Sequence, residues 1–333
     1  MELTLEQIKS IAFGAAYIDE KGGMISLHRF TAEQEDLYRT VSDDFYSKTF
    51  ASAGIYLEFL SDSRELELFC FLTPTSSRLF FSISVFVDGE PSDELKMSFA
   101  DKENRTGYVG KAFKLGDTNE QRKVTVYLPW SFCAQICKLA IDDGAYIKPV
   151  EKKTKMMIFG DSISQGYDAH STHGSYASIL SRMLDADARN KGIGGEIFRP
   201  ELASLRDDDF RPDIITVAYG TNDWCAWESY ESMQKNCDAF YGELVKNYPS
   251  AKIFALSPIW RKDFAEVTRV GGFDNAKEII KKAAEKHSSI IFIDAYDFVP
   301  HSLDLMDDRF VHPNDEGFEH YANALYEVIK NHV

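Results

Sequence analysis

Apolar and polar positions follow two different patterns in the two halves of the chain. Between residues 54 and 128 they mostly alternate, as over 81–88, and Asp88-Gly89 supplies a turn signal. A period of two predicts half-buried strands, and no long amphipathic helix is expected to interrupt them. We therefore interpret residues of about 20–150 as an antiparallel β-sandwich of the jelly-roll type.

The second half alternates short apolar runs with longer segments of helical period. The runs are Met156–Phe159, Ile214–Ala218, Ile253–Leu256 and Ile290–Ile293. The helices are expected at Ser175–Leu184, Ser229–Asn247, Asn275–Lys286 and Asp315–Lys330. Alternation of strands and helices predicts βαβ crossovers and a parallel sheet covered on both faces. We expect a β-sandwich domain at 1–150 and an α/β domain at 151–333.

Composition and charge exclude several classes of function. The chain has 333 residues and a formal net charge of −16, which argues against nucleic acids and anionic membranes as partners. No apolar stretch reaches the roughly 18 residues of a membrane span. The first residues lack the features of a signal peptide, which predicts a cytoplasmic protein. The five cysteines match no zinc spacing, so we expect reduced thiols.

Candidate chemistry begins with Gly160-Asp161-Ser162, directly after the first apolar run. A serine at the tip of a strand-to-helix turn can expose its hydroxyl, but it needs a base to become a good nucleophile. His312, just before the last predicted helix, can supply that base, and Asn222 follows the second apolar run. Each residue lies at the carboxyl end of a predicted strand or just before a helix, where open α/β sheets build their sites.

Four motifs in this order resemble the SGNH (GDSL) hydrolase superfamily. They are Gly160-Asp161-Ser162, Gly192-Ile193-Gly194-Gly195, Gly220-Thr221-Asn222-Asp223 and Val311-His312-Pro313-Asn314. Residues 53–63 and 127–130 also resemble the N-terminal β-domain of two-domain members, which include carbohydrate deacetylases of the acetylxylan-esterase type. The resemblance implies a flavodoxin-like three-layer domain with a parallel sheet, preceded by a jelly-roll-like sandwich. It implies no metal or other cofactor.

The resemblance also implies a role for each motif. Ser162 would be the nucleophile, and His312 would take its proton and return one to the leaving alcohol. The backbone N–H groups of Ser162 and Gly195, with the side-chain amide of Asn222, would form the oxyanion hole. Gly194 would replace Gly195 if the register differs by one residue.

One position departs from the family pattern. Members usually carry an aspartate three residues before the histidine, where this chain has Arg309. Either a one-residue bulge lets Asp308 reach His312 Nδ1, or a backbone carbonyl takes its place, as in members with a dyad. We favour Asp308 over Asp307 and Asp304, because a full charge stabilises an imidazolium better than a carbonyl dipole does.

Three further residues are candidates for the substrate pocket. Trp224 and Trp227 come directly after the Asn222 motif, so we expect at least one of them to line the pocket, with core packing as an equal alternative. His170 lies in a polar loop together with His173. No third ligand is spaced to complete a zinc site there, so we expect His170 at the pocket rim.

These residues favour a serine esterase that removes a short acyl group, most simply acetyl, from a carbohydrate or other hydrophilic ester. The expected partner is therefore a small-molecule or oligosaccharide ester. Two alternatives remain open: a lipase, arylesterase or thioesterase for longer or aromatic acyl groups, and a carbohydrate-binding protein whose hydrolase site has decayed. The absent aspartate at 309 suggests decay, whereas Ser162, Asn222 and His312 argue against it. The sequence predicts no oligomeric state.

Overall fold

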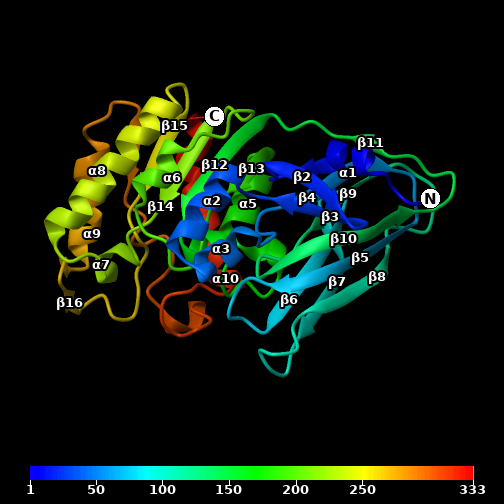
Figure 1. Cartoon of the computed structure of the whole chain (residues 1–333), viewed down its shortest axis with the longest axis horizontal. Coiled ribbons are helices and arrows are strands. Elements are labelled where there is room, and N and C mark those ends of the chain that lie inside the picture. Colours follow the sequence, from blue (N-terminus) through cyan, green and yellow to red (C-terminus); the bar gives the residue numbers. More distant parts are fainter. Residues whose placement is uncertain (333) are drawn as a thin grey trace.

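The computed structural model describes residues 1–332 and shows a β-sandwich lying beside a parallel sheet with helices on both faces (Figure 1). The sandwich is built from the first half of the chain and the parallel sheet from the second half. The fold class expected from the sequence is therefore confirmed. Among the described residues, no helix is both long enough and apolar enough to cross a membrane.

The sandwich is a jelly roll of eight main strands. These are β3 (Met24–His28), β4 (Tyr56–Ser61), β5 (Glu65–Pro74), β6 (Phe80–Val87), β7 (Glu90–Ser98), β8 (Gly107–Lys114), β9 (Arg122–Tyr127) and β10 (Phe132–Ile141). One sheet has the order β3-β10-β5-β8 and the other β4-β9-β6-β7, which is the interleaving of two Greek keys. Short strands extend the edges: β1 (Ala12–Phe13), β2 (Tyr17–Lys21) and β11 (Lys148–Pro149).

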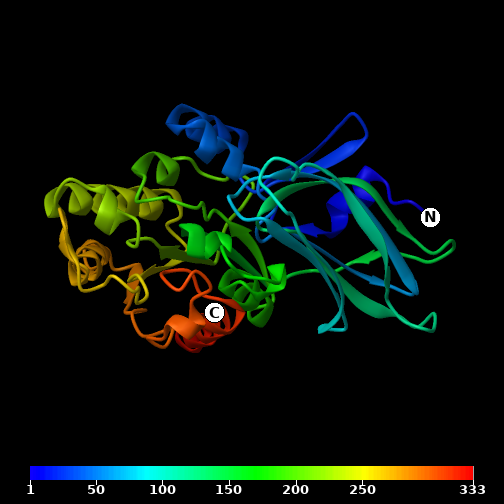
Figure 2. The same ribbon diagram turned by 90° about the horizontal axis from the view of Figure 1, so that it is seen from below.

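Three helices precede or interrupt the sandwich: α1 (Leu5–Ile11), α2 (Ala32–Val41) and α3 (Asp43–Thr49). The interpretation of residues of about 20–150 as a β-sandwich is wrong for residues 32–49, which form α2 and α3. The local cause is helix capping, because Thr31 and Gln34 form a capping box and Ser42 caps α3. Figures 1 and 2 show α2 and α3 beside the parallel-sheet half, and Tyr38 of α2 is buried in the core there. The domain division at residue 150 stays a prediction.

The parallel sheet has the strand order β13-β12-β14-β15-β18. Its strands are β12 (Thr154–Gly160), β13 (Ala186–Asn190), β14 (Ile214–Ala218), β15 (Lys252–Leu256) and β18 (Ile290–Ile293). In chain order this is 2-1-3-4-5, the flavodoxin-like winding. The sequence interpretation missed β13, because its residues alternate small and charged side chains instead of forming an apolar run.

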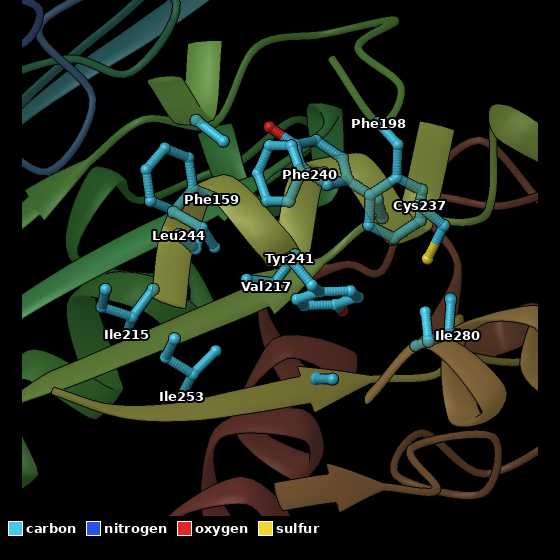
Figure 3. Packing of buried hydrophobic residues seen from close by; sticks show 14 of the residues in the cluster. Phe159, Phe198, Ile215, Val217, Cys237, Phe240, Tyr241, Leu244, Ile253 and Ile280 are labelled. Carbon is cyan, nitrogen blue, oxygen red and sulfur yellow. The ribbon is translucent and has the colours of Figure 1, made fainter. Parts of the chain in front are cut away.

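Helices cover both faces of this sheet. They are α4 (Ser162–Gln165), α5 (Tyr176–Met183), α6 (Pro200–Ser204), α7 (Asp223–Ala226), α8 (Tyr230–Asn247), α9 (Asp274–Ala284) and α10 (Asp315–Ile329). Short 3-10 turns lie at Thr172–Gly174, Leu303–Leu305 and Lys330–His332, and a small hairpin is formed by β16 (Val267–Thr268) and β17 (Gly271–Gly272). Successive residues of β12 enter opposite cores: Phe159 packs with Phe240 of α8 (Figure 3), and Ile158 packs with α5 and α10.

Candidate active site

The candidate residues come together at the point where the winding of the sheet reverses. Ser162 follows β12, Gly195 follows the neighbouring β13, and Asn222 follows β14 on the other side. His312 reaches them from the loop before α10. The carboxyl edge of an open α/β sheet is hollow at such a switch point, so segments distant in sequence converge there.

Ser162 opens the short helix α4 and is 9% exposed. Its Oγ lies 2.8 Å from His312 Nε2. Asp161 caps this helix by accepting the N–H of Ile163 at 2.9 Å. Gly160 has no room for a side chain, since an added Cβ would lie 2.0 Å from Ser164 Oγ. The turn that presents Ser162 is therefore fixed by both a cap and close packing.

Asp308 contacts the other side of the imidazole, with its Oδ2 2.7 Å from His312 Nδ1. Its Oδ1 accepts the N–H groups of Phe310, Val311 and His312 at 2.9, 2.8 and 3.1 Å. Burial raises the pKa of Asp308, but the hydrogen bonds from His312 and Val311 outweigh burial and hold this pKa well below its usual range. Arg309 has a left-handed backbone with φ +54°, which accommodates the extra residue. Asp308 is thus ionised and aimed at His312.

The sequence resemblance assigns two backbone N–H groups, those of Ser162 and Gly195, to an oxyanion hole. Gly194 N–H donates to Gln165 Oε1 at 2.8 Å, whereas within residues 1–332 the N–H groups of Gly195 and Ser162 make no hydrogen bond. Gly195 has φ +91°, a backbone conformation that favours glycine. Of the two glycines left open by the sequence, Gly195 is the one whose N–H is free to bind an oxyanion.

Asn222 lies beside the Gly195 loop and donates one amide N–H to the carbonyl of Glu196 at 3.0 Å. Within residues 1–332 its second amide N–H makes no hydrogen bond. Buried Asp223 accepts the N–H groups of Gly220 and Phe198 at 3.0 and 2.9 Å, which ties the Asn222 turn to the oxyanion loop. Burial raises the pKa of Asp223 to about 6. Asp223 therefore orients Asn222 from the first residue of α7 rather than capping a helix.

Helix α3 and Arg29, which precedes α2, contact the loop that carries Gly195. The buried guanidinium of Arg29 donates to four backbone carbonyls, those of Ala51, Asn190, Gly192 and Lys48, at 2.6 to 3.0 Å. Lys48 Nζ donates to the carbonyl of Gly194 at 2.9 Å. The ring of Phe45 lies 3.7 Å from where a Cβ of Gly195 would be. Arg29, Phe45 and Lys48 thus contact one side of the loop around Gly195, and the sequence motifs did not reveal this contact.

A second carboxylate, that of Asp168, adjoins His312. Asp168 Oδ2 lies 3.4 Å from His312 Nδ1, and Asp168 is 1% exposed. Arg78, from the loop between β5 and β6, binds both oxygens of Asp168, with Nη2 2.5 Å from Oδ2. Among the described residues, Asp168, Asp308 and His312 are also the one cluster compact enough to hold a metal ion. Arg78 and the Nδ1–Asp308 hydrogen bond already occupy these donors.

The structure corrects one pocket residue. Trp224 is 1% exposed, belongs to the core beside α8 and α9, and donates its Nε1–H to the carbonyl of Gly271 at 2.8 Å. The expectation that Trp224 lines the pocket is therefore wrong, because the apolar interior takes this ring. Trp227 is half-buried and donates to Asp223 Oδ1 at 2.8 Å. Contact of Trp227 with substrate stays a prediction.

His170 is exposed and lies against the catalytic loop. Its Nε2 is 2.7 Å from Asp307 Oδ1, next to Asp308 in the chain, and its ring stacks on Phe80 with the centroids 4.8 Å apart. This places His170 between the sandwich and the loop of His312. A role for His170 at the pocket rim stays a prediction.

Comparisons with known proteins agree with this geometry. Residues 158–320 match the GDSL-like lipase/acylhydrolase family, and this span contains Ser162, Gly195, Asn222 and His312. The fold and the family together define the class of this protein as an ester hydrolase. The α/β half thus carries the sequence pattern of the GDSL-like lipase/acylhydrolase family. No curated protein matches the chain by sequence.

Several solved structures share the whole fold. A salicylyl-acyltransferase from a tetracycline biosynthetic pathway has a TM-score of 0.80 at 19% identity, covering 96% of this chain and 94% of that one. A GDSL-like lipase from Bacteroides ovatus has a TM-score of 0.77 at 19% identity, covering 99% and 97%. A family two carbohydrate esterase from Clostridium thermocellum, solved with cellohexaose, has a TM-score of 0.65 at 17% identity, covering 84% and 93%. At such identities the likeness shows a common fold.

Proposed function

We propose that this protein is a serine esterase that removes a short acyl group, most simply acetyl, from a carbohydrate or other hydrophilic ester. One observation carries the mechanism: Ser162 Oγ, His312 and Asp308 form a continuous line of hydrogen bonds of 2.8 and 2.7 Å. This is the arrangement in which a neutral imidazole activates a hydroxyl and a carboxylate stabilises the resulting imidazolium.

The proposed reaction is acyl transfer in two halves. Ser162 Oγ attacks the ester carbonyl while His312 Nε2 takes its proton, and the N–H groups of Ser162, Gly195 and Asn222 stabilise the oxyanion. The bond to the leaving alcohol then breaks as His312 returns the proton to that oxygen, leaving an acyl-serine. Water then attacks the acyl carbonyl while His312 takes its proton. The bond between the acyl carbon and Ser162 Oγ breaks as His312 returns the proton to Oγ, which releases the carboxylic acid and restores Ser162. Asp308 holds the Nδ1–H tautomer throughout.

The room beside Gly195 supports a short acyl group. The ring of Phe45 lies beside Gly195. Lys48 and Arg29 bind the backbone of the same loop, so the loop has little freedom to move away from Phe45 and make room for a longer acyl chain. The carbohydrate part of the proposal is supported by the likeness to family two carbohydrate esterases. The likeness to the salicylyl-acyltransferase motivates a second candidate function, in which the acyl group is transferred to an alcohol instead of water.

The variant Ser162→Ala tests the proposal. It should lose hydrolysis of p-nitrophenyl acetate by at least about 10³-fold, because no other group replaces the nucleophile. Ser164→Ala is a matched control on the same helix: its hydroxyl contacts Tyr176 and not His312, so activity should stay within about tenfold. Near wild-type activity in Ser162→Ala, with an unchanged circular dichroism spectrum, would refute the mechanism.

A further inference from the structure

We propose that Arg78 and Asp168 are positioning residues for the reaction, an ion pair through which the β-sandwich sets the charge around His312. The inference rests on the proposed function. Arg78 belongs to the sandwich loop between β5 and β6, and Asp168 follows α4 in the parallel-sheet half. The pair therefore joins the two halves of the molecule at the catalytic histidine.

Two carboxylates, those of Asp168 and Asp308, lie beside the same ring atom, His312 Nδ1. Asp168 Oδ2 accepts from Arg78 Nη2 at 2.5 Å and also lies 3.4 Å from His312 Nδ1. Asp308 accepts the hydrogen bond of Nδ1 at the shorter distance of 2.7 Å. Asp168 therefore does not replace Asp308. It adds a second negative charge beside the imidazole, and Arg78 is positioned to compensate for that charge.

The ring of His312 is also held by Tyr167, which in turn contacts Arg78. Tyr167 stacks on the imidazole with the centroids 5.6 Å apart, and the Arg78 guanidinium lies 5.4 Å from the centroid of the Tyr167 ring. Trp130, from the loop after β9, donates its Nε1–H to the carbonyl of Ala169 at 2.8 Å. The segment that carries Asp168 is thus held by two separate loops of the sandwich.

A purely structural ion pair would not need this placement. Asp168 has φ +72°, a left-handed backbone that non-glycine residues adopt at some cost, and its carboxylate is fully buried. Such residues gather at functional sites, where the surrounding structure compensates for the strain. Here the result is a buried carboxylate aimed at the reacting imidazole.

Compensation of the Asp168 charge by Arg78 matters for the chemistry of His312. Each uncompensated carboxylate beside an imidazole stabilises its protonated form, which cannot act as a base. The charged groups that face His312 are Asp308 from its own loop, Asp168 and Asp161 from either side of α4, and Arg78 from the sandwich. Arg78 is the cation within this set that neutralises Asp168.

The pH profile of kcat/KM tests the inference, because its acid limb reports the pKa of the free-enzyme base. In Arg78→Gln the Asp168 charge is uncompensated, so the midpoint should move up by about one pH unit. In Asp168→Asn an uncompensated Arg78 should move the midpoint down by a similar amount. The double variant removes both charges together and should return to within about 0.3 units of wild type.

Controls separate positioning from folding. Arg78→Lys keeps the charge and should keep the midpoint, even where kcat falls. Lys111→Gln removes a cation that pairs with Asp93 of the sandwich at 2.7 Å and not with any charged group around His312, so it should leave the profile unchanged. Asparagine tolerates a left-handed backbone, so Asp168→Asn decides the matter even if Arg78→Gln fails to fold.

Two outcomes are distinct. If Ser162→Ala retains wild-type activity, the proposed function itself fails. If hydrolysis depends on Ser162 but kcat falls equally at every pH in Arg78→Gln and Asp168→Asn, with no movement of either midpoint, the ion pair is only structural and this inference is overturned.

Discussion

Asp308 reaches His312 because Arg309 adopts a left-handed backbone, while three N–H groups of residues 310–312 converge on the same carboxylate. The departure from the family spacing is therefore a change of loop geometry that keeps an acid in contact with Nδ1. A carboxylate at that position favours the Nδ1–H tautomer and stabilises the imidazolium formed during the reaction.

This contact predicts that Asp308→Asn lowers kcat by about 10²- to 10⁴-fold, because an amide favours the wrong tautomer and carries no counter-charge. Steady-state kinetics with p-nitrophenyl acetate measures the effect. Asp307→Asn is the matched control, since Asp307 contacts His170 instead, and should cost less than about tenfold. A loss below tenfold in Asp308→Asn would instead favour a dyad supported by a backbone carbonyl.

At the scale of elements, the proposed function puts Phe45 of helix α3 at the acyl pocket, because its ring lies beside Gly195. We expect wild-type enzyme to prefer acetyl over octanoyl esters, and Phe45→Ala to raise the octanoyl-to-acetyl ratio of kcat/KM. Each methylene that the widened pocket buries could contribute up to about 0.8 kcal/mol. Phe69→Ala is a control on an exposed ring of the sandwich and should not change the ratio. A wild-type optimum at eight carbons or more would favour the lipase or thioesterase alternative.

Some elements were predictable because local signals determine them. Strands β14 and β18 occupy the residues expected from their apolar runs, since strands covered on both faces must be apolar throughout. Strand β13 was missed because it carries Asp187 and Arg189, and Arg189 is buried by pairing with aspartates. Helices α2 and α3 were missed because their capping signals are short and their packing partners lie far away in sequence.

Some residues of the candidate site could likewise be predicted from the sequence, and others could not. The residues of the four motifs converge as expected, because the carboxyl ends of neighbouring parallel strands must lie at one edge. Arg78, Asp168 and Phe45 carry no motif. Only the packing of the sandwich side against the α/β side brings Arg78 to Asp168 and Phe45 to Gly195, whereas Asp168 reaches His312 from the loop after α4. Trp224 could not be assigned from sequence because a tryptophan suits a core and a pocket equally.

At the scale of the molecule, the two halves share their cores. Phe30 and Tyr38 pack in the cluster on one face of the parallel sheet, and Ala53 and Trp130 pack in the cluster on the other face. The buried guanidinium of Arg29 adds hydrogen bonds to the β13 loop. Separation of the halves would expose these groups to water, so their stabilities are coupled.

This coupling predicts a single cooperative unfolding transition. Differential scanning calorimetry should give one peak, and near-ultraviolet and far-ultraviolet circular dichroism should report coincident midpoints. Arg29→Met should lower the stability of both halves together, whereas Arg39→Met, at an exposed position of α2, should have little effect. Two separated transitions, with esterase activity lost in only one of them, would contradict the coupling.

The most direct test of the proposed mechanism is to trap the acyl-enzyme. The protein is mixed with p-nitrophenyl acetate, quenched rapidly in acid and analysed by mass spectrometry of its peptides. The mechanism predicts one added acetyl group on Ser162 in the wild type and none at that position in Ser162→Ala. Continuous hydrolysis with no acetyl on Ser162 at any time of quenching, or with the acetyl on another residue, would contradict the account.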